Sequence, residues 1–321
     1  MSPAPPRLRF AHLPTPVEPM PRLSAALGGP QLWIKRDDQT GLAGGGNKAR
    51  KLEYLIAAAQ AGGARTLVTA GAAQSNHCRQ TAAAAARFGF NCTLVLSGRA
   101  PAQAQGNLLL DHLLGARLIW AGEQPVEAAL QMAFDQAWAD GQRPYLIPVG
   151  GSNAVGAAGY VQAMAEFLSQ GQPVERIVAA SSSGGTLAGL LVGAALHGFA
   201  GTITAIRVGK YEQTEPAQLA RLVAETADLF GQTIDLSALQ YRVVDDYLGP
   251  GYGVVTEQER EAIRLFARVE GILLDPVYTG RAASGMLDLI RKGEISSDER
   301  LLFWHTGGTP ALFAYGQELL G

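Results

Sequence analysis

Short runs of β-branched and apolar residues recur along the chain, separated mostly by segments rich in alanine and leucine. Eight of these runs have the composition of strands, and they begin near residues 65, 92, 116, 144, 176, 203, 241 and 301. Segments between them, such as "SNHCRQTAAAAARFG" and "VTEQEREAIRLFARVEG", space their apolar residues as helices do. This alternation predicts an α/β fold whose largely parallel sheets are covered by helices on both faces. Ligands in such folds bind at the carboxyl ends of the strands.

Charge and composition restrict the class of partner. A formal net charge of −2 provides no field that attracts nucleic acid or an anionic membrane, so a small-molecule partner is expected. Cys78 and Cys92 flank one predicted helix without the spacing of a metal site, and we expect reduced thiols in a cytoplasmic protein. The most apolar stretch, residues 184–201, contains His197 and many glycines, which favours a buried helix over a membrane span.

The segment "GLAGGGNKARKLE", residues 41–53, places a lysine directly after a cluster of glycines. It is not a nucleotide-binding P-loop, because Asn47 interrupts the pattern and Ala49 replaces the hydroxyl that would hold magnesium. No strand is followed by the Gly-x-Gly-x-x-Gly turn and distant acidic residue of a dinucleotide-binding oxidoreductase. The glycines are expected to let the backbone approach a flat cofactor, and Asn47 to cap a helix.

The phase of that helix gives Lys48 a chemical role. One apolar stripe contains Leu52, Leu55, Ile56 and Ala59. Lys48 falls at its centre, Lys51 lies at its edge, and Arg50 and Glu53 face away. The alternative is a solvated surface lysine. A buried lysine at the positive end of a helix has a lowered pKa instead, and a neutral amine is what a Schiff base requires. Pyridoxal 5'-phosphate (PLP) is the cofactor that this hypothesis predicts.

Two further turns between a strand and a helix supply polar groups. The first, "SSSGGTLAGL" at 181–190, offers backbone amides and the hydroxyls of Ser182, Ser183 and Thr186 to a phosphate, although such loops are also ordinary tight turns. The second, "TAGAAQSNHCRQTA" at 69–82, places Ser75 and Asn76 at a helix N-terminus, where a carboxylate could bind or Ser75 could simply be an N-cap.

Six segments, in order along the chain, together carry a family resemblance. They are "IKRDDQTGLAGGGNKARKLEYL", "AGAAQSNHCRQTAA", "IPVGGSNAVGAAGY", "DDYLGPGYG", "LLDPVYTGRAASGM" and "HTGGTPALFAY". The chain from about residue 10 to its C-terminus resembles the fold-type II PLP enzymes that include D-cysteine desulfhydrase and 1-aminocyclopropane-1-carboxylate (ACC) deaminase. The fold expected from this resemblance has two lobes, each with a largely parallel sheet covered by helices.

The resemblance also implies roles for individual residues. Lys48 would bind PLP covalently and move the α-proton, and Asn76 would bond the ring hydroxyl of PLP. The remaining expected catalytic residues are Ser75, Tyr252 and Tyr278. The remaining expected cofactor-binding residues are Ser182, Ser183, Gly184, Gly185, Thr186, Thr279 and Thr306. The expected substrate-binding residues are Ser75, Asn76, His77, Tyr252 and Tyr278.

Two threonines separate branches of the family. ACC deaminases resemble this chain near Tyr278, but they have glutamate at the position of Thr279 and leucine at that of Thr306. Carboxylates keep a pyridine nitrogen protonated better than hydroxyls do, and the threonines therefore fit an easier β-elimination than cyclopropane opening. The reaction implied is D-cysteine to pyruvate, hydrogen sulfide and ammonia.

Other functions stay open at this stage. L-Cysteate sulfo-lyases resemble the same family and would give pyruvate, sulfite and ammonia, but the second anion of cysteate needs an extra cation or donors, and His77, Arg79 and Arg281 are the candidates. ACC deaminase is a further alternative. A PLP-binding relative without activity would be favoured if Lys48, Ser75 or either tyrosine were replaced, and all four are present.

The lobes follow from the resemblance and from two glycine clusters, near 44–46 and 150–159. Residues 1–47 and 157–321 are expected to form a large PLP-binding domain, with residues 48–156 inserted as a small domain. A homodimer is the assembly that the resemblance implies.

Overall fold

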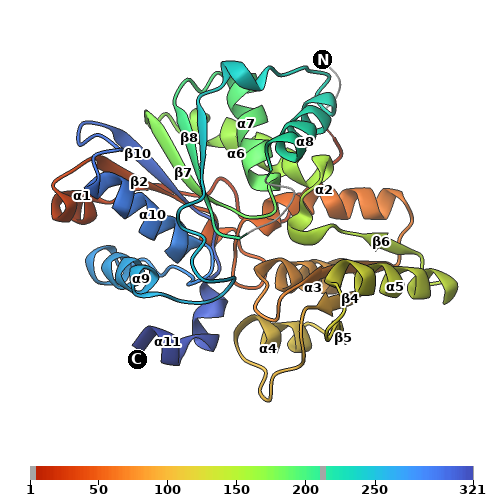
Figure 1. Cartoon of the computed structure of the whole chain (residues 1–321). Coiled ribbons are helices and arrows are strands. Elements are labelled where there is room, and N and C mark those ends of the chain that lie inside the picture. Colours follow the sequence, from red (N-terminus) through yellow and green to blue (C-terminus); the bar gives the residue numbers. More distant parts are fainter. Residues whose placement is uncertain (1–4, 210–214, 321) are drawn as a thin grey trace.

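Two sheets form the centre of the computed structural model, which describes residues 5–209 and 215–320 (Figure 1). The six-stranded sheet has the order β1-β2-β10-β7-β8-β9. Its strands are β1 (Val17–Pro19), β2 (Gln31–Arg36), β7 (Arg176–Ser181), β8 (Thr202–Arg207), β9 (Tyr241–Val244) and β10 (Arg300–His305). The four-stranded sheet has the order β5-β4-β3-β6. Its strands are β3 (Thr66–Gly71), β4 (Asn91–Leu96), β5 (Arg117–Trp120) and β6 (Pro144–Leu146).

Helices cover both faces of the six-stranded sheet, as parallel strands require. On β10, Leu301 and Phe303 face one core and Leu302 and Trp304 face the other. The first face packs against α1 (Pro21–Leu27), α9 (Glu257–Glu270) and α10 (Thr279–Arg291). The second face packs against α6 (Ala154–Ser169), α7 (Gly185–His197) and α8 (Pro216–Asp228).

The four-stranded sheet is covered in the same way. One face packs against α2 (Lys48–Ala61), α3 (Asn76–Phe88) and α4 (Gly106–Leu113). The other face packs against α5 (Val126–Ala139). The remaining short elements are α11 (Gly316–Leu320) and the 3₁₀ helices η1 (Asp37–Gln39), η2 (Val149–Gly151), η4 (Leu236–Ala238) and η5 (Thr309–Ala314).

The predicted α/β class and the eight predicted strands are confirmed, and the sequence did not predict β1 and β2. All strand pairs between described residues are parallel except β1 with β2. The apolar stretch at 184–201 contains α7, a buried helix, as expected. Within 5–209 and 215–320, the helices are all too short or too polar to cross a bilayer.

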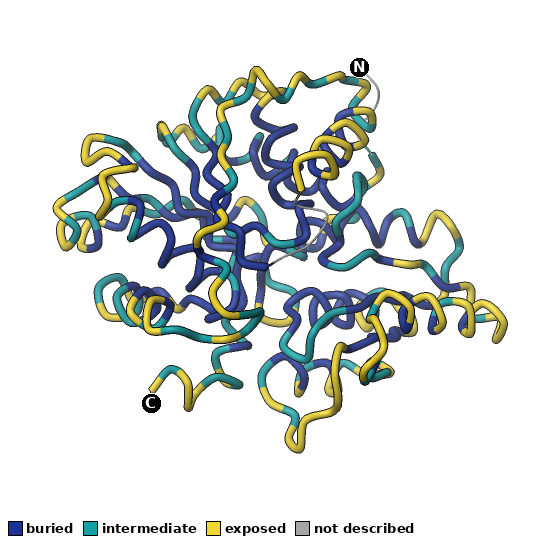
Figure 2. The backbone as a smooth tube through the Cα atoms, in the orientation of Figure 1, coloured by how far each residue is buried: buried dark blue, intermediate teal, exposed yellow. Residues whose placement is uncertain are grey.

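Helix α2 differs from the predicted amphipathic helix because it is buried on every side along most of its length (Figure 2). Arg50 and Glu53, which were expected to face away from the core, are 2% and 0% exposed. Glu53 pairs with Arg7 at 2.6 Å, and Arg50 pairs with Asp37 at 2.8 Å. Lys51, placed at the edge of the stripe by the sequence, is only 1% exposed. Ion pairs with distant segments bury charges that a helical pattern assigns to solvent.

Candidate active site

The glycine cluster before α2 packs against the backbone of its own chain. A Cβ atom on Gly45 would lie 1.8 Å from the carbonyl oxygen of Asp38, and one on Gly46 would lie 2.5 Å from Nε2 of Gln80. The amide of Gly46 donates to the Thr40 hydroxyl at 2.9 Å, and that hydroxyl donates to the Gly46 carbonyl at 2.8 Å. These glycines fold a tight loop that fixes where α2 begins, and none of them lines either of the two cavities described below. Their approach to a cofactor stays a prediction.

Asn47 occupies the N-cap position of α2 but does not cap the helix. Its backbone is helical, with φ −57° and ψ −23°, and its side chain makes no capping hydrogen bond. Its Nδ2 donates instead to Oγ1 of Thr186 at 3.1 Å, and its backbone amide donates to the Thr306 carbonyl at 2.9 Å. The predicted cap is corrected to a bridge that ties the start of α2 to the start of α7.

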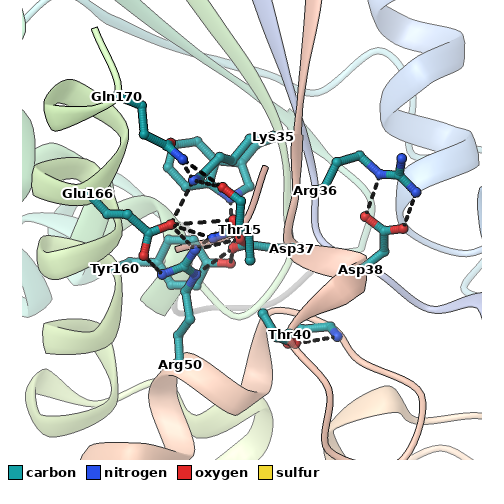
Figure 3. Close-up of polar contacts among 12 residues, drawn as sticks. Thr15, Lys35, Arg36, Asp37, Asp38, Thr40, Arg50, Tyr160, Glu166 and Gln170 are labelled. Atoms are coloured by element: carbon teal, nitrogen blue, oxygen red, sulfur yellow. Dashed lines mark hydrogen bonds and ion pairs between the residues drawn. The ribbon is translucent and has the colours of Figure 1, made fainter. Parts of the chain in front are cut away.

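A cluster of buried charges also holds α2 in place, through Arg50 (Figure 3). Arg50 donates to both oxygens of Asp37, at 2.9 and 2.8 Å, and to both oxygens of Glu166, at 2.9 and 2.8 Å. Asp37 also accepts from Tyr160 at 2.6 Å and from the indole of Trp304 at 2.8 Å. Burial opposes ionisation of Asp37, but Arg50 outweighs it and lowers the pKa of the carboxyl below its ordinary value. The helix that carries Lys48 is thus fixed to β10 and α6.

Lys48 is the first residue of α2 and lines two adjoining cavities. Burial lowers the pKa of its amine to about 8 from an ordinary value of 10.5. The electrostatic effect predicted for this lysine is therefore present. A substantial fraction of the amine is neutral near pH 8, the form that attacks a carbonyl carbon.

The N-terminus of α3 brings three predicted site residues together. Ser75 is the N-cap, and its hydroxyl accepts from the Cys78 amide at 3.1 Å. Oδ1 of Asn76 accepts from Nδ2 of Asn107 at 2.9 Å, which leaves the amide hydrogens of Asn76 available toward the cavity it lines. His77, which the resemblance places among the substrate-binding residues, is buried.

His77 is neutral in this environment. Burial lowers its pKa well below 6.5, and the charges of Lys48 and Lys51 lower it further. Its Nε2 lies 2.8 Å from the Thr69 hydroxyl, which itself donates to the Ile147 carbonyl at 2.7 Å. Nε2 is therefore the protonated nitrogen, and Nδ1 is an acceptor that has no partner among the described residues.

The loop between β7 and α7 presents amides and hydroxyls, as the sequence predicts for residues 181–186. The Ser183 hydroxyl lies 2.7 Å from that of Ser152, which accepts from the Gly185 amide at 3.2 Å. A Cβ on Gly185 would lie 2.8 Å from Cα of Ser152 and 3.0 Å from Nζ of Lys51. Glycine at 185 thus allows the η2 loop and Lys51 to pack directly beneath the α7 N-terminus.

The two predicted tyrosines meet although 26 residues separate them. Their hydroxyls are hydrogen-bonded to each other, and their rings pack edge to face with centroids 5.9 Å apart. Tyr278 is the N-cap of α10, and its amide donates to Asp275 at 2.9 Å. The Thr279 hydroxyl donates to the same carboxylate at 2.8 Å.

Two adjoining cavities collect most of these side chains. The first cavity is lined by Asn47, Lys48, Asn76, His77, Ala180, Ser181, Ser182, Ser183, Gly184, Thr186, Leu187, Tyr278 and Thr306. The second cavity is lined by Lys48, Gly71, Ala72, Ser75, His77, Val149, Gly150, Ser182, Ser183, Tyr252 and Tyr278. Gly185 and Thr279, which were predicted to contact the cofactor, line neither cavity. Ser182 and Ser183 of the α7 loop line both cavities, Gly184 and Thr186 line only the first, and Ser75 and Tyr252 line only the second.

The sequence did not identify several residues at this site. Ser152 and Lys51 lie behind the α7 loop, where Nζ of Lys51 donates to the Gly150 carbonyl at 3.1 Å. The motif "IPVGGSN" contains Ser152, but no local pattern shows that it meets a loop 31 residues away. Of the arginines proposed as extra cations, Arg79 donates to the Gly45 carbonyl at 2.8 Å, and Arg281 is 1% exposed. Neither arginine lines either cavity.

The residues of the first cavity fit PLP. Helix α7 begins there without an acidic residue in its first turn, so its free amides favour a phosphate dianion. The buried Ser181 hydroxyl lines this cavity and has no hydrogen-bond partner among the described residues. The Lys48 amine, with its lowered pKa, lines the same cavity. An anion site and a nucleophilic amine in one cavity are what PLP requires.

Comparison with known proteins of similar sequence and structure shows the family of this chain. The model of the family "Pyridoxal-phosphate dependent enzyme" matches residues 8–307. D-cysteine desulfhydrase of Salmonella typhimurium is 44% identical over 319 residues, which cover 97% of this chain and 96% of the relative. A crystal structure of an ACC deaminase homologue superposes with a TM-score of 0.91 at 37% identity, covering 98% of this chain and 96% of that one.

A more distant structure shares the fold. L-serine ammonia-lyase of Rhizomucor miehei has a TM-score of 0.69 at 18% identity, covering 97% of this chain and 99% of the other. The chain therefore belongs to the family of pyridoxal-phosphate dependent enzymes, and it has their fold-type II architecture.

Proposed function

We propose that this protein is a PLP-dependent carbon–sulfur lyase that converts D-cysteine and water to pyruvate, hydrogen sulfide and ammonia. The observation that carries the proposal is the 44% identity to D-cysteine desulfhydrase over nearly the full length of both chains. The cavity lining agrees with it. Lys48 is the one lysine or arginine among the described residues that line the two cavities, and His77 is neutral.

The cofactor would lie in the first cavity. Its phosphate would bind at the α7 N-terminus, against Ser182, Ser183, Gly184 and Thr186, with Gly185 keeping the turn tight. Asn76 would donate to its ring hydroxyl, because Asn107 already occupies the side-chain oxygen of Asn76. When bound, PLP supplies an electron sink for the α-carbon of an attached amino acid.

The two threonines expected at the pyridine nitrogen differ in whether their hydroxyls are free to donate a hydrogen bond to the ring. Thr306 lines the first cavity. The Thr279 hydroxyl lines neither cavity, donates its hydrogen to Asp275 and accepts from the Asp275 amide, so it would have no hydrogen to offer the ring. Neither supplies a carboxylate, which favours elimination of a good leaving group over cyclopropane opening.

The protein's own side chains then perform the proton transfers. The neutral amine of Lys48 would remove the α-proton, and amides at the α3 N-terminus, near Asn76 and His77, would hold the substrate carboxylate. Ser75, Tyr252 and Tyr278 surround the remainder of the second cavity with hydroxyls. Loss of the α-proton and breakage of the bond from Cβ to sulfur release the thiol, and water completes the conversion to pyruvate and ammonia.

Cysteate is the informative competitor because it carries a sulfonate where cysteine carries a thiol. A second anion needs a second cation or several donors. Arg79 and Arg281, the candidates from the sequence, bond to backbone carbonyls away from the two cavities. We therefore expect D-cysteine to be preferred to L-cysteate.

The test is pyruvate release by the PLP-loaded enzyme on D-cysteine and L-cysteate in parallel, with sulfide and sulfite measured separately. Faster turnover of D-cysteine with stoichiometric sulfide supports the proposal. Faster turnover of L-cysteate, with release of sulfite, would leave the family assignment intact and contradict D-cysteine as the preferred substrate. L-Cysteine and ACC serve as controls for stereochemistry and for the alternative branch.

We also propose the domain limits suggested by the sequence: a large domain of residues 1–47 and 157–321, and a small domain of residues 48–156. Supporting this division, the strands of the four-stranded sheet fall within residues 66–146 and those of the six-stranded sheet fall outside them. Limited proteolysis of the apoenzyme near 44–46 and 150–159 would test it.

A cytoplasmic homodimer is the assembly we propose. Supporting self-association, Leu109, Leu113 and Phe313 are 45%, 72% and 75% exposed on two elements in contact, α4 and η5. Supporting a reducing compartment, Cys78 and Cys92 are free thiols. Light scattering coupled to size-exclusion chromatography measures the mass, and Leu113→Glu with Phe313→Glu should yield a monomer if this surface is the interface.

A further inference from the structure

Arg281 is a buried arginine that bonds mainly to backbone carbonyls. It is 1% exposed and lies in α10, three residues after the N-cap. Its Nη1 donates to the Leu248 carbonyl at 2.7 Å and to the Gly251 carbonyl at 3.3 Å. Its Nη2 donates to the Val254 carbonyl at 2.8 Å. One planar, permanently charged group therefore binds three carbonyls of a single loop.

This loop carries Tyr252. Residues 248, 251 and 254 bracket the tyrosine, and the loop contains no helix or strand that would hold it otherwise. Gly249 has φ +64°, and a Cβ atom there would lie 3.0 Å from Nη2 of Arg281. The chain thus wraps closely around the guanidinium on both sides of Tyr252, which lines the second cavity.

A carboxylate fixes the guanidinium in turn. Oε1 of Glu259 accepts from Nε of Arg281 at 2.8 Å. Oε2 of Glu259 accepts from the Thr256 amide at 2.8 Å, in the capping box that begins α9. Although burial opposes it, bonds from Thr256 and Arg281 lower the pKa of Glu259, so the carboxylate is ionised at neutral pH. The group formed by Arg281, Glu259 and the three carbonyls is called the Arg281 clamp below.

Helix α10 connects the clamp to the second tyrosine. Tyr278 is the N-cap of α10, and Arg281 follows three residues later. The hydroxyls of Tyr278 and Tyr252 bond to each other. One turn of α10 therefore positions Tyr278 directly and Tyr252 through the clamp.

We propose that Arg281 is a positioning residue that acts through Tyr252 to shape the second cavity for the substrate, without taking part in cofactor binding. The inference rests on the proposed function, because the substrate is the one named there. Tyr252 lines only the second cavity. Ser182 and Ser183 line both cavities, whereas four other residues of the proposed cofactor site line only the first: Asn76, Gly184, Thr186 and Thr306. Loss of the clamp should therefore affect turnover of D-cysteine and leave the affinity for PLP unchanged.

Arg281→Lys and Glu259→Gln test the clamp in the PLP-loaded enzyme. Lysine keeps the charge but cannot form the fork, whereas glutamine keeps the shape of Glu259 and remains a capping-box residue. The matched control is Arg176→Lys, because Arg176 pairs with Glu299 at 2.7 Å at the start of β7 and lines neither cavity. We expect kcat/KM for D-cysteine to fall about 100-fold in Arg281→Lys, since small displacements of positioning groups have effects of that order.

Three further measurements separate positioning from general damage. In a double-mutant cycle, Arg281→Lys should lower kcat/KM little further when Tyr252 is already Phe, because both changes act through the Tyr252 hydroxyl. Hydrogen exchange of holoenzyme peptides spanning 248–254 should become faster in both clamp variants and not in Arg176→Lys. The PLP dissociation constant should stay within about twofold of wild type, less than 0.5 kcal/mol.

The outcomes are distinct. The proposal would be overturned if Arg281→Lys lowered kcat/KM equally in the presence and absence of the Tyr252 hydroxyl. It would also be overturned if hydrogen exchange at 248–254 were unchanged in the clamp variants. If PLP affinity and turnover fell together, the positioning role would also be contradicted, and Arg281 would have a purely structural role. If Arg281→Lys does not fold, Glu259→Gln decides by the same readouts. A wild-type enzyme that is inactive on D-cysteine would contradict the proposed function, and the exchange measurement would still decide the clamp.

Discussion

At the scale of single residues, the proposed chemistry depends on the protonation of Lys48. Burial lowers the pKa of its amine to about 8, so the amine is mostly protonated at pH 6 and mostly neutral at pH 9. Only the neutral form has the lone pair that attacks the carbonyl of PLP. We expect the rate of covalent PLP attachment to the apoenzyme to rise with pH and to level off above about 8. Borohydride trapping at fixed times measures it, and a rate that still rises at pH 10 would identify an ordinary lysine.

Replacing the amine tests its assignment. Lys48→Ala should abolish turnover of D-cysteine and borohydride fixation of the cofactor. The protein should remain folded, because the change removes a poorly solvated amine rather than a packed apolar group. Thermal unfolding of the apoenzyme and far-UV circular dichroism are the controls. Retained turnover would contradict the assignment.

At the scale of elements, the start of α7 is where a single methyl group should matter most. A Cβ on Gly185 would lie 2.7 Å from Oγ and 2.8 Å from Cα of Ser152, so Gly185→Ala must displace the loops beneath the proposed phosphate site. Overpacking of this kind costs about 1–3 kcal/mol. We expect Gly185→Ala to weaken PLP binding at least about tenfold, measured by fluorescence titration of the apoenzyme.

Gly198, at the other end of α7, gives the matched control. It has φ +78°, and a Cβ atom there would have no described neighbour within 4 Å, so Gly198→Ala strains the backbone without touching the site. It should lower stability and leave PLP affinity unchanged. Equal weakening of PLP binding by both substitutions would show that helix stability, and not the loop geometry, determines the affinity.

The same elements show what the sequence predicts and what it does not. Local patterns suffice for eight of the ten described strands, for α7 and for the lowered pKa of Lys48, because the spacing of apolar residues and the position in a helix are local properties. They fail for Asn47, whose partner Thr186 lies 139 residues away, and for Arg50, whose partner Glu166 lies 116 residues away. Strand β2 was missed for the same reason. Its Lys35 resembles a surface residue until Glu166 pairs with it at 2.7 Å.

At the scale of the whole molecule, the cluster of Asp37, Arg50 and Glu166 joins segments from the two sides of the site. Arg50 follows Lys48 by two residues on α2, whereas Asp37 follows β2 and Glu166 belongs to α6. Arg50 and Lys35 both bond to Glu166, and Arg50 also bonds to Asp37 (Figure 3). These carboxylates are buried or nearly so. Forming such a pair gains little net free energy, but removing one partner leaves buried charge uncompensated.

Arg50→Met should therefore lower the free energy of unfolding by about 3–5 kcal/mol, because Asp37 and Glu166 lose their shared counter-charge. Urea unfolding of the apoenzyme measures it. The matched control is Arg99→Met, since Arg99 pairs with Glu123 at 2.6 Å with the two side chains 80% and 86% exposed. An exposed pair of this kind contributes almost nothing measurable. If the two variants unfold at the same urea concentration, the cluster does not hold α2, and the placement of Lys48 must depend on the glycine loop and the Asn47 bridge alone.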